Sequence, residues 1–459
     1  MNPEIFREYD IRGIADKDLN DEVVVTLGRA LGTYLQRHGC KSFTLGRDCR
    51  LSSTRLRDRL SEGLLSTGCD VTDIGVCPTP LLYFSLHQLN CDGGVMITGS
   101  HNPAEYNGFK VAQGELTIHG DQIQEVRKVA EAGDFLEGEG EREEVDLLPD
   151  YHRYVVEALG KLSNPPRVVV DAGNGTAGPI APQIYRDLGC EVIELYCTMD
   201  GNFPNHHPDP TVLENLQDLI QKVEQEKADV GISFDGDSDR LGVVDDQGNV
   251  IWGDYLMILY SREILRRTPG ATIIGEVKCS QNLYDDIEKQ GGRGIMWKAG
   301  HSLIKAKMKE EDATLAGEMS GHMFFADRYF GYDDAIYAGA RLLEILSESD
   351  QKMSQMLADV PKVYNTPEIR VDCPEHLKFD VVRRAQEFFA QQYQTVTVDG
   401  VRVLFDNGWG LVRASNTQPV LVLRFEAQSQ ERLEEIRSLI EEKLEEFIEK
   451  TAAQKAQSP

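Results

Sequence analysis

The sequence contains no apolar run long enough to cross a bilayer, and residues 1–7 lack the apolar segment of a signal peptide. Positive charge is also scarce. The chain has 48 Lys and Arg residues against 76 Asp and Glu residues, a formal net charge of −28. Such an acidic chain repels nucleic acids and anionic membranes. We therefore expect a cytoplasmic protein with neither as a partner, and a local cationic pocket for any anionic substrate.

The cysteines form no paired pattern. There are nine of them, an odd number, and they are scattered without any Cys-x-x-Cys spacing. This distribution is typical of reduced thiols, which agrees with a cytoplasmic location.

What the chain does contain is an alternation of strand-like and helix-like segments over 459 residues, enough for three or four domains. We predict α/β layers with parallel or mixed sheets, whose buried strands include residues 42–46, 94–98, 167–171 and 271–275. Apolar strands run into polar, glycine-containing loops three times, at residues 98–100, 234–236 and 315–318. Three similar units that each lend one loop to a shared cleft would explain this pattern, although no strict period accompanies it.

Several segments mark the limits of these units. The acidic residues 134–146 predict a solvated linker, a second break falls at 246–249, and two prolines bracket a hinge at 360–367. Residues 430–450 carry an apolar stripe, which favours one amphipathic helix on a sheet over a coiled coil. The tail, residues 451–459, is predicted to be disordered.

A small nucleophilic hydroxyl follows one of the predicted strands. Residues 98–103 read Thr-Gly-Ser-His-Asn-Pro and come directly after the apolar residues 94–97. Such a turn holds Ser100 at the carboxyl edge of a sheet, where α/β proteins bind ligands. The loop lacks Gly-x-Ser-x-Gly, so it is not the nucleophile elbow of an α/β-hydrolase.

Three alternate carboxylates follow another predicted strand, in residues 235–240, Asp-Gly-Asp-Ser-Asp-Arg. They match the start of a calcium loop, but Arg240 stands where that loop needs glycine and Asp246 stands where it needs glutamate. A Mg²⁺ site completed by a phosphate oxygen fits better than calcium signalling, and a solvated acidic turn is the plain alternative. A serine together with a hard-cation site indicates phosphoryl transfer.

A glycine-rich turn at residues 171–178 superficially resembles a nucleotide-binding loop. It lacks the lysine of a P-loop and the spacing of a dinucleotide fingerprint. We interpret it as a tight strand-to-helix turn with a structural role.

Together, the serine and aspartate loops resemble the α-D-phosphohexomutase family, most closely its bacterial bifunctional phosphomannomutase/phosphoglucomutases. The resemblance covers essentially the whole chain, in order, through motifs at residues 6–13, 98–103, 107–110, 235–240, 317–322 and 413–419. It implies four domains around a central cleft: three related α/β/α sandwiches with mixed sheets, then a smaller C-terminal α+β domain. With the breaks above, we expect these domains at residues 1–146, 147–248, 249–362 and 363–459. In that order they carry the phosphoserine loop, the metal loop, the sugar-recognition loop, and the phosphate-binding loop of a mobile lid.

The resemblance also implies an activity. Family members interconvert hexose 1-phosphate and hexose 6-phosphate, here of glucose and mannose, through phospho-Ser100 and a hexose 1,6-bisphosphate. The implied cofactors are Mg²⁺ and glucose 1,6-bisphosphate, as activator and intermediate. The expected partners are hexose phosphates, and the protein is expected to act as a monomer.

Roles for individual residues follow from the matched motifs. The implied Mg²⁺ ligands are Asp235, Asp237, Asp239 and an oxygen on Ser100. The implied catalytic residues are Ser100, His101, Lys110, Arg240 and Arg12. The implied substrate-binding residues are Tyr9, Lys278, His301, Glu318, Ser320, Arg413, Ser415, Asn416 and Thr417.

Elementary chemistry agrees with these assignments. A phosphoserine carries about −1.5 to −2 charges, so three aspartates would repel it unless a divalent cation lies between them. Lys110, Arg240 and His101 suit stabilisation of the transferring phosphoryl group, and Lys110 also suits a proton shuttle.

The sugar and its distal phosphate need different partners. Glu318 and Ser320 suit vicinal sugar hydroxyls. If they grip O3 and O4, the C2 epimers glucose and mannose look alike. Arg413 offers a planar fork to the phosphate that does not react.

Three alternatives remain open at this stage. The first is a phosphoglucosamine mutase. Those enzymes usually carry Gln in place of Met319, so the loop at residues 317–322 favours a hexose mutase. A Mg²⁺-dependent sugar phosphatase would use water to resolve phospho-Ser100. A non-catalytic sugar-phosphate-binding protein would not need the complete set of reactive side chains.

Overall fold

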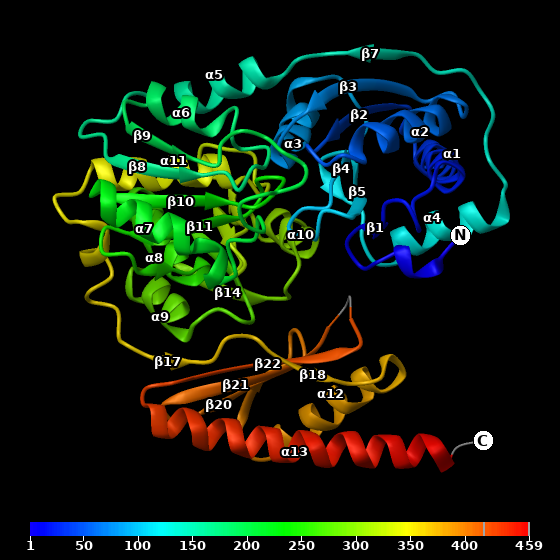
Figure 1. The fold of residues 1–459 in the computed structure, drawn as a ribbon. Coiled ribbons are helices and arrows are strands. Elements are labelled where there is room, and N and C mark those ends of the chain that lie inside the picture. Colours follow the sequence, from blue (N-terminus) through cyan, green and yellow to red (C-terminus); the bar gives the residue numbers. More distant parts are fainter. Residues whose placement is uncertain (416–417, 458–459) are drawn as a thin grey trace.

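Four β-sheets follow one another along the chain in the computed structural model, which describes residues 1–415 and 418–457 (Figure 1). The first three combine parallel and antiparallel strands and carry helices, and the fourth is wholly antiparallel. The predicted fold class is therefore confirmed. Among the described residues, none of the helices combines the length and the apolar character that a bilayer span needs.

The first sheet has the strand order β1-β5-β4-β2-β3-β7, with β6 paired to β5. Its strands are β1 (Ile11–Ile14), β2 (Ser42–Arg47), β3 (Asp70–Val76), β4 (Gly93–Ile97), β5 (Tyr106–Gln113), β6 (Leu116–Thr117) and β7 (Arg142–Glu144). Its helices are α1 (Asp21–Arg37), α2 (Ser53–Leu65), α3 (Thr79–Gln88) and α4 (Asp121–Ala132), after a short 3₁₀ turn at Pro3–Ile5. Helix α1 begins where the Asn20 side chain accepts from the amide of Val23.

Strand β7 corrects the predicted linker. It lies within the acidic segment 134–146 and pairs in parallel with β3. The side chains of β7 are exposed, as a solvated segment requires, but its backbone satisfies the free edge of β3. The solvated-linker interpretation is wrong for residues 142–144.

The second sheet has the order β12-β11-β10-β8-β9 and the third has the order β14-β13-β15-β16. The second domain contains α5 (Leu148–Leu159), β8 (Arg167–Asp171), α6 (Ala181–Asp187), β9 (Glu191–Leu195), a 3₁₀ turn (Leu213–Leu216), α7 (Gln217–Glu226), β10 (Val230–Phe234), β11 (Leu241–Asp245) and β12 (Val250–Ile251). The third contains α8 (Gly253–Arg267), β13 (Thr272–Glu276), α9 (Gln281–Lys289), β14 (Arg293–Trp297), α10 (His301–Glu311), β15 (Leu315–Gly317), β16 (Met323–Phe325), α11 (Ala335–Ser347) and a 3₁₀ turn (Met353–Gln355).

The domain limits stay a prediction. Because β12 pairs with β11, we propose to move the second limit from residue 248 to residue 251.

One arrangement recurs in the first three sheets. A central strand runs parallel to one neighbour and ends in a polar loop. After the loop the chain forms the next strand, which pairs with the central strand on its other side in the antiparallel sense. The pairs are β4 with β5, β10 with β11, and β15 with β16. This topology accounts for the three strand-to-loop patterns in the sequence, and it places each loop at the carboxyl end of a central strand.

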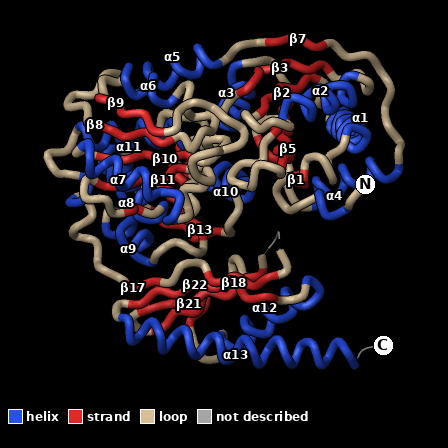
Figure 2. The backbone as a smooth tube through the Cα atoms, viewed as in Figure 1, coloured by secondary structure: helices blue, strands red, loops and turns tan. Residues whose placement is uncertain are grey.

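The fourth domain has its own core. Its strands are β17 (Tyr364–Asn365), β18 (Ile369–Asp372), β19 (Gln394–Val396), β20 (Val401–Phe405), β21 (Gly408–Ala414) and β22 (Val420–Ala427), and its helices are α12 (Glu375–Phe389) and α13 (Gln430–Gln457). The two helices pack together on one face of the sheet (Figure 2). By contrast, one continuous apolar cluster joins the first three domains. The fourth domain is thus built as a separate body.

Helix α13 confirms one expectation and corrects another. Its stripe, Leu433 to Phe447, is buried against the sheet and α12, so it is an amphipathic helix on a sheet. The helix continues to Gln457, so the predicted disorder of the tail is wrong up to that residue. Ala-rich residues after Thr451 favour continued helix, and the Thr451 hydroxyl donates to the carbonyl of Phe447 at 2.7 Å. The last residues, 458–459, lie outside the described chain.

Candidate active site

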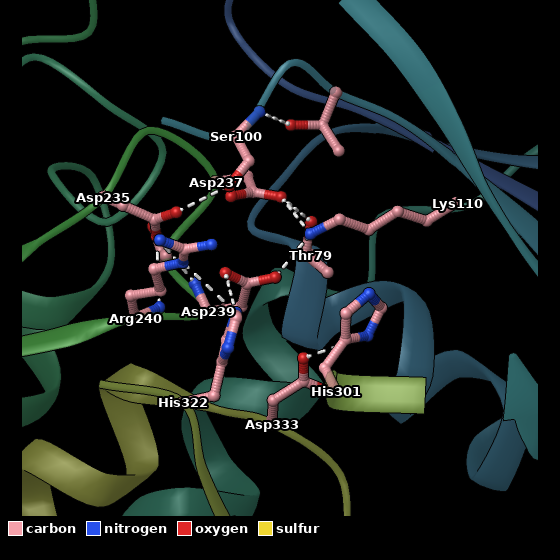
Figure 3. Close-up of polar contacts among 12 residues, drawn as sticks. Thr79, Ser100, Lys110, Asp235, Asp237, Asp239, Arg240, His301, His322 and Asp333 are labelled. Carbon is pink, nitrogen blue, oxygen red and sulfur yellow. Dashed lines mark hydrogen bonds and ion pairs between the residues drawn. The ribbon is translucent and has the colours of Figure 1, made fainter. Parts of the chain in front are cut away.

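Two loops from different domains meet at Ser100, as the sequence pattern indicated (Figure 3). Ser100 is buried, with a left-handed backbone (φ 47°) directly after β4. Its hydroxyl donates to Oδ2 of Asp235 at 2.8 Å and lies 3.1 Å from Nδ1 of His101. A nucleophilic oxygen and a carboxylate that are 135 residues apart in the chain thus face each other.

Arg50 holds the serine loop, and the sequence analysis missed it. This buried guanidinium donates to backbone carbonyls of the loop at 2.6–3.0 Å, those of Ser100, Asn102, Pro103 and Tyr106. Its Nε pairs with Asp48 at 3.1 Å. A Cβ on Gly99 would lie 2.5 Å from Cζ of Arg50, so glycine is required beside the clamp. The only sequence feature that could have indicated the role of Arg50 is the position of residues 48–50 directly after β2, the strand next to β4.

Replacing this clamp tests its role. Arg50→Lys removes the planar fork that serves four acceptors. We expect turnover in the phosphohexomutase reaction that the motifs imply to fall about 10- to 100-fold and the free energy of unfolding to fall by about 2–4 kcal/mol. Steady-state kinetics and denaturant unfolding measure the two effects. Arg37→Lys, on the exposed side of α1, is the matched control and should change neither.

The aspartate loop folds around Asp235. One oxygen, Oδ1, accepts from the amides of Asp239 and Arg240, each at 3.1 Å. Gly236 comes so close to the serine loop that a Cβ there would lie 2.6 Å from the carbonyl oxygen of Ser100. The glycine-rich turn, residues 171–178, supports this loop, because the amide of Thr176 donates to the Gly236 carbonyl at 3.1 Å.

The three carboxylates of this loop suit a hard divalent cation. Each of Asp235, Asp237 and Asp239 is fully buried and offers an oxygen within 4.8 Å of the others. Oδ1 of Asp237 is buried without any hydrogen-bond partner. Because an unpartnered buried carboxylate oxygen is costly, this orphan oxygen indicates a cation ligand.

Positive side chains surround the carboxylates. Nζ of Lys110, on β5, lies 2.8 Å from Oδ2 of Asp237 and also pairs with Asp239. Burial alone would lower the pKa of Lys110, but these carboxylates raise it well above its usual value. Burial and the two neighbouring carboxylates raise the pKa of Asp235 well above its usual value. Thr79, which the sequence analysis also missed, donates to Oδ2 of Asp237 at 2.6 Å from the start of α3.

His322 connects the aspartate loop, residues 235–240, to the loop at residues 317–322. Its Nε2 lies 3.2 Å from Oδ1 of Asp239 and its Nδ1 lies 2.6 Å from Oε2 of Glu318. Burial alone would lower the pKa of His322, but the two carboxylates raise it to about 10. The imidazole is therefore doubly protonated at neutral pH. His322 is part of the motif at residues 317–322, but the sequence analysis gave it no role. Only its place between the two carboxylates marks it as a residue of the site.

The loop at residues 317–322, between β15 and β16, contacts a second loop of the third domain, residues 298–301. Oε1 of Glu318 accepts from the amide of Gly300 at 2.6 Å, and Oγ of Ser320 lies 3.3 Å from Nδ1 of His322. Burial alone would raise the pKa of Glu318, but His322 and the Gly300 amide hold it at about 2. Glu318 therefore remains an acceptor at neutral pH.

The remaining candidates of the first domain, Arg12 and Tyr9, lie around this centre together with His301 of the third domain. Nη1 of Arg12 donates to Oδ1 of Asn102 at 3.0 Å, beside the serine. The Tyr9 hydroxyl donates to the carbonyl of Ala299 at 3.0 Å. His301 begins α10, with Nδ1 3.7 Å from Oδ2 of Asp333, and its ring centroid lies 6.1 Å from that of Tyr9.

Lys278 belongs to the third domain, and Arg413 and Ser415 belong to the fourth. Nζ of Lys278 is 3.5 Å from Oε1 of Glu276 and 3.3 Å from Oε2 of Glu368. Nε of Arg413 donates to Oδ2 of Asp399 at 2.9 Å. Ser415 ends the described part of its loop, with its hydroxyl 3.2 Å from the amide of Gln418. Asn416 and Thr417 lie outside the described residues.

Comparisons with known proteins agree with this arrangement. Family models for the phosphoglucomutase/phosphomannomutase α/β/α domains I, II and III match residues 3–137, 149–248 and 252–364, and the model for the C-terminal domain matches residues 368–443. The chain belongs to the phosphoglucomutase/phosphomannomutase family. The motif-based resemblance is thereby confirmed.

Individual relatives span nearly the full length. The chain is 49% identical to a phosphomannomutase/phosphoglucomutase of Pseudomonas aeruginosa over 96% of this chain and 95% of that protein. It is 46% identical to a phosphoglucomutase of Neisseria gonorrhoeae, covering 95% of each. The crystal structure of a phosphoglucomutase/phosphomannomutase family protein from Burkholderia thailandensis superposes with a TM-score of 0.92 at 44% identity, covering 97% of this chain and 98% of that one.

Proposed function

We propose that this enzyme interconverts the 1-phosphates and 6-phosphates of glucose and mannose through a phosphorylated Ser100. The observation that carries the proposal is the hydroxyl of Ser100, 2.8 Å from Oδ2 of Asp235 in a loop whose Asp237 keeps an unpartnered oxygen. A nucleophilic oxygen beside a hard-cation site is what reversible phosphoryl transfer requires. Family membership and the names of the full-length relatives support the same activity.

Asp235, Asp237 and Asp239 are the residues that would hold Mg²⁺, together with an oxygen of the modified Ser100. The bound ion supplies electrostatic stabilisation of the negative charge that develops on the Ser100 oxygen when its phosphoryl group leaves. Lys110, His322 and the guanidinium of Arg240, which interacts with the charges of Asp235 and Asp239, add positive charge around the same carboxylates, so the pocket accepts an anionic substrate in spite of the acidic chain.

The transfer step balances within the site. The bond from phosphorus to Oγ of Ser100 breaks, and a bond from phosphorus to O1 or O6 of the hexose forms. The proton of the sugar hydroxyl ends on the Ser100 oxygen. Lys110 relays it: the protonated amine donates to Oγ as that oxygen leaves and takes up the sugar proton. The raised pKa of Lys110 keeps it protonated at the start of this exchange.

The product of the first transfer is a hexose 1,6-bisphosphate, which must turn around before the opposite phosphate returns to Ser100. Glu318 and Ser320 grip the vicinal hydroxyls O3 and O4 in both orientations, which leaves the configuration at C2 unread. Arg413 binds the phosphate that is not reacting, with Ser415, Asn416 and Thr417 as further members of that loop. Arg12, Tyr9, Lys278 and His301 complete the binding surface, and glucose 1,6-bisphosphate serves as activator.

A coupled assay with glucose 1-phosphate, mannose 1-phosphate and glucosamine 1-phosphate tests the substrate class. We expect turnover of the first two and little of the third. Release of inorganic phosphate at the rate of substrate loss would instead identify a phosphatase. We propose further that the enzyme works as a cytoplasmic monomer, because one chain supplies every group named above.

A second experiment tests whether Arg413 binds the phosphate that does not react. Arg413→Ala removes a charge-assisted fork to phosphate, so KM should rise about 10- to 100-fold and bisphosphate should escape during turnover. Arg437→Ala, on the exposed side of α13, is the control. Unchanged KM together with no released bisphosphate in the Arg413 variant would remove its clamping role.

A further inference from the structure

The fourth domain presents a buried, charged face to the third domain. Side chains alternate along its strands, so Val401, Val403 and Phe405 of β20 face α12 and α13, while Arg402 and Leu404 point the other way. On that second face lie Arg402 of β20, Trp409, Leu411 and Arg413 of β21, and Arg424 and Glu426 of β22. A solvated sheet face would be exposed, whereas these side chains are at most 7% exposed.

Arg402 reaches across the domain boundary. The guanidinium is fully buried, and its Nη1 donates to the carbonyls of Val277 and Cys279 at 2.8 and 2.7 Å. Its Nη2 donates to Oε1 of Gln281 at 3.0 Å, and its Cζ lies 3.7 Å from the centroid of the Trp409 ring. The two carbonyls flank Lys278, so a side chain of the fourth domain fixes the backbone on both sides of a substrate-binding candidate.

Asp399 reaches a second loop of the third domain. Its Oδ2 accepts from the amide of Ala299 at 3.2 Å and from Nε of Arg413 at 2.9 Å. Ala299 lies two residues before His301, and its carbonyl accepts from Tyr9 of the first domain. The Asp399 carboxylate therefore orients Arg413, the residue proposed to bind the distal phosphate, and joins it to the loop that carries His301.

Both contacts come from one short segment, the bend at residues 399–400 and the first two residues of β20, which we call the latch turn. Residues 399–402 read Asp-Gly-Val-Arg, and the first and last of them make the contacts above. Gly400 has φ 74°, and a Cβ there would lie 2.2 Å from the carbonyl oxygen of Val412. Only glycine fits this close approach, which projects Asp399 and Arg402 toward the third domain together.

We propose that the turn 399–402 is the latch of the lid: Asp399 and Arg402 bind the 298–301 and 277–279 loops when the fourth domain closes, and so complete the substrate site. This inference rests on the proposed function, in which Arg413 binds the distal phosphate. Opening of the domain would release the phosphate clamp, Lys278 and the His301 loop in one movement. Asp399 and Arg402 are positioning residues, since neither is assigned a contact with the sugar.

The contacts suit a latch that opens repeatedly. The hydrogen-bond partners of Arg402 are neutral oxygens, so its charge is buried without a directly paired carboxylate and regains hydration on opening. The apolar part of this interface is a small cluster of Val277, Trp409 and Leu411, whereas the large cores lie within the first three domains and within the fourth. The closed state is therefore held mainly by directional polar contacts. These are the contacts of the latch turn, the Glu426 carboxylate that accepts from the amide of Gln281 at 3.0 Å, and the ion pair of Lys278 with Glu368 at 3.3 Å.

The test compares Asp399→Asn and Arg402→Lys with two controls in the same domain. Asp406→Asn changes an exposed carboxylate in the turn at the other end of β20, and Arg432→Lys changes a partly exposed guanidinium of α13. For both latch variants we expect a KM for glucose 1-phosphate about tenfold higher, a kcat changed less than KM, and a several-fold larger fraction of turnovers that release glucose 1,6-bisphosphate. The controls should match wild type.

Hydrogen exchange in the absence of substrate gives a readout independent of activity. Amides of residues 277–281 and 298–301 should exchange about tenfold faster in the latch variants, while amides of β10 stay as in wild type. If Arg402→Lys fails to fold, Asp399→Asn alone decides the matter, because its side chain is partly exposed. Wild-type KM, bisphosphate retention and exchange in a folded Asp399→Asn variant would overturn the latch. If the wild-type enzyme showed no mutase activity, the proposed function would be overturned. The hydrogen-exchange measurement would then still test whether Asp399 and Arg402 hold the 277–281 and 298–301 segments.

Discussion

Ser100→Ala should reduce mutase activity by about 10⁴-fold or more while the protein remains folded. The variant lacks the oxygen that, in the proposed cycle, accepts and returns the phosphoryl group. The change removes one hydroxyl at a position that keeps its backbone contact with Arg50. The free energy of unfolding should fall by about 1–3 kcal/mol, because Oδ2 of buried Asp235 loses the Ser100 hydroxyl.

The measurement pairs a coupled assay with intact-mass spectrometry. Wild-type enzyme incubated with glucose 1,6-bisphosphate should gain one phosphoryl group, and the Ser100 variant should gain none. Ser66→Ala, which removes an exposed hydroxyl from the first domain, should behave as wild type in both measurements. Wild-type turnover by the Ser100 variant would rule out the covalent route.

The sequence was most informative where chemistry and topology coincide. A nucleophilic serine and three alternate aspartates each followed an apolar strand, and each strand brings its loop to the carboxyl edge of its own sheet, where α/β proteins bind ligands. The contact between Ser100 and Asp235 could therefore be anticipated, as could the place of Glu318 at the third equivalent loop. Sequence reasoning succeeded here because each motif was unusual in itself.

Sequence reasoning failed where the partner is a backbone carbonyl or where no motif marks the residue that makes the contact. Arg50 donates to four carbonyl oxygens, which any residue supplies, so no residue pattern marks them. Arg402 does the same across a domain boundary, with acceptors 123 and 125 residues away. Thr79 reaches Asp237 from the start of a helix 158 residues earlier. Such residues become visible only when the fold sets them side by side.

The two errors of secondary structure have a similar cause. Residues 142–144 are strongly acidic, which favours a solvated linker, but the free edge of β3 pairs with their backbone whatever their side chains. Beyond Thr451, the apolar stripe of α13 is weaker, and the helix continues on local propensity and contacts with α12 such as the ion pair of Lys455 with Asp380. In both places tertiary context outweighs composition.

Asp237→Asn should lower mutase activity about 10³-fold and abolish most of the stabilisation that Mg²⁺ confers. Asp237 combines an orphan oxygen, Oδ1, with a second oxygen held by Thr79 and Lys110, so we expect it to act both as a ligand of the ion and as an anchor of the loop. Loss of its charge leaves a weaker site for the ion and leaves Lys110 with Asp239 as its remaining carboxylate partner.

Thermal unfolding with and without Mg²⁺ separates the metal site from catalysis. An ion at 100 times its Kd stabilises a folded protein by about 2.7 kcal/mol, so wild-type Tm should rise with added Mg²⁺. The Tm of the Asp237 variant should stay nearly constant, and that of Asp134→Asn, an exposed carboxylate paired with Arg37, should rise as in wild type. Because the charge repulsion among three buried carboxylates is relieved in the Asp237 variant, its Tm without Mg²⁺ should not fall far below that of wild type. Equal Mg²⁺ stabilisation of all three proteins would place the ion elsewhere and leave the orphan oxygen of Asp237 without its partner.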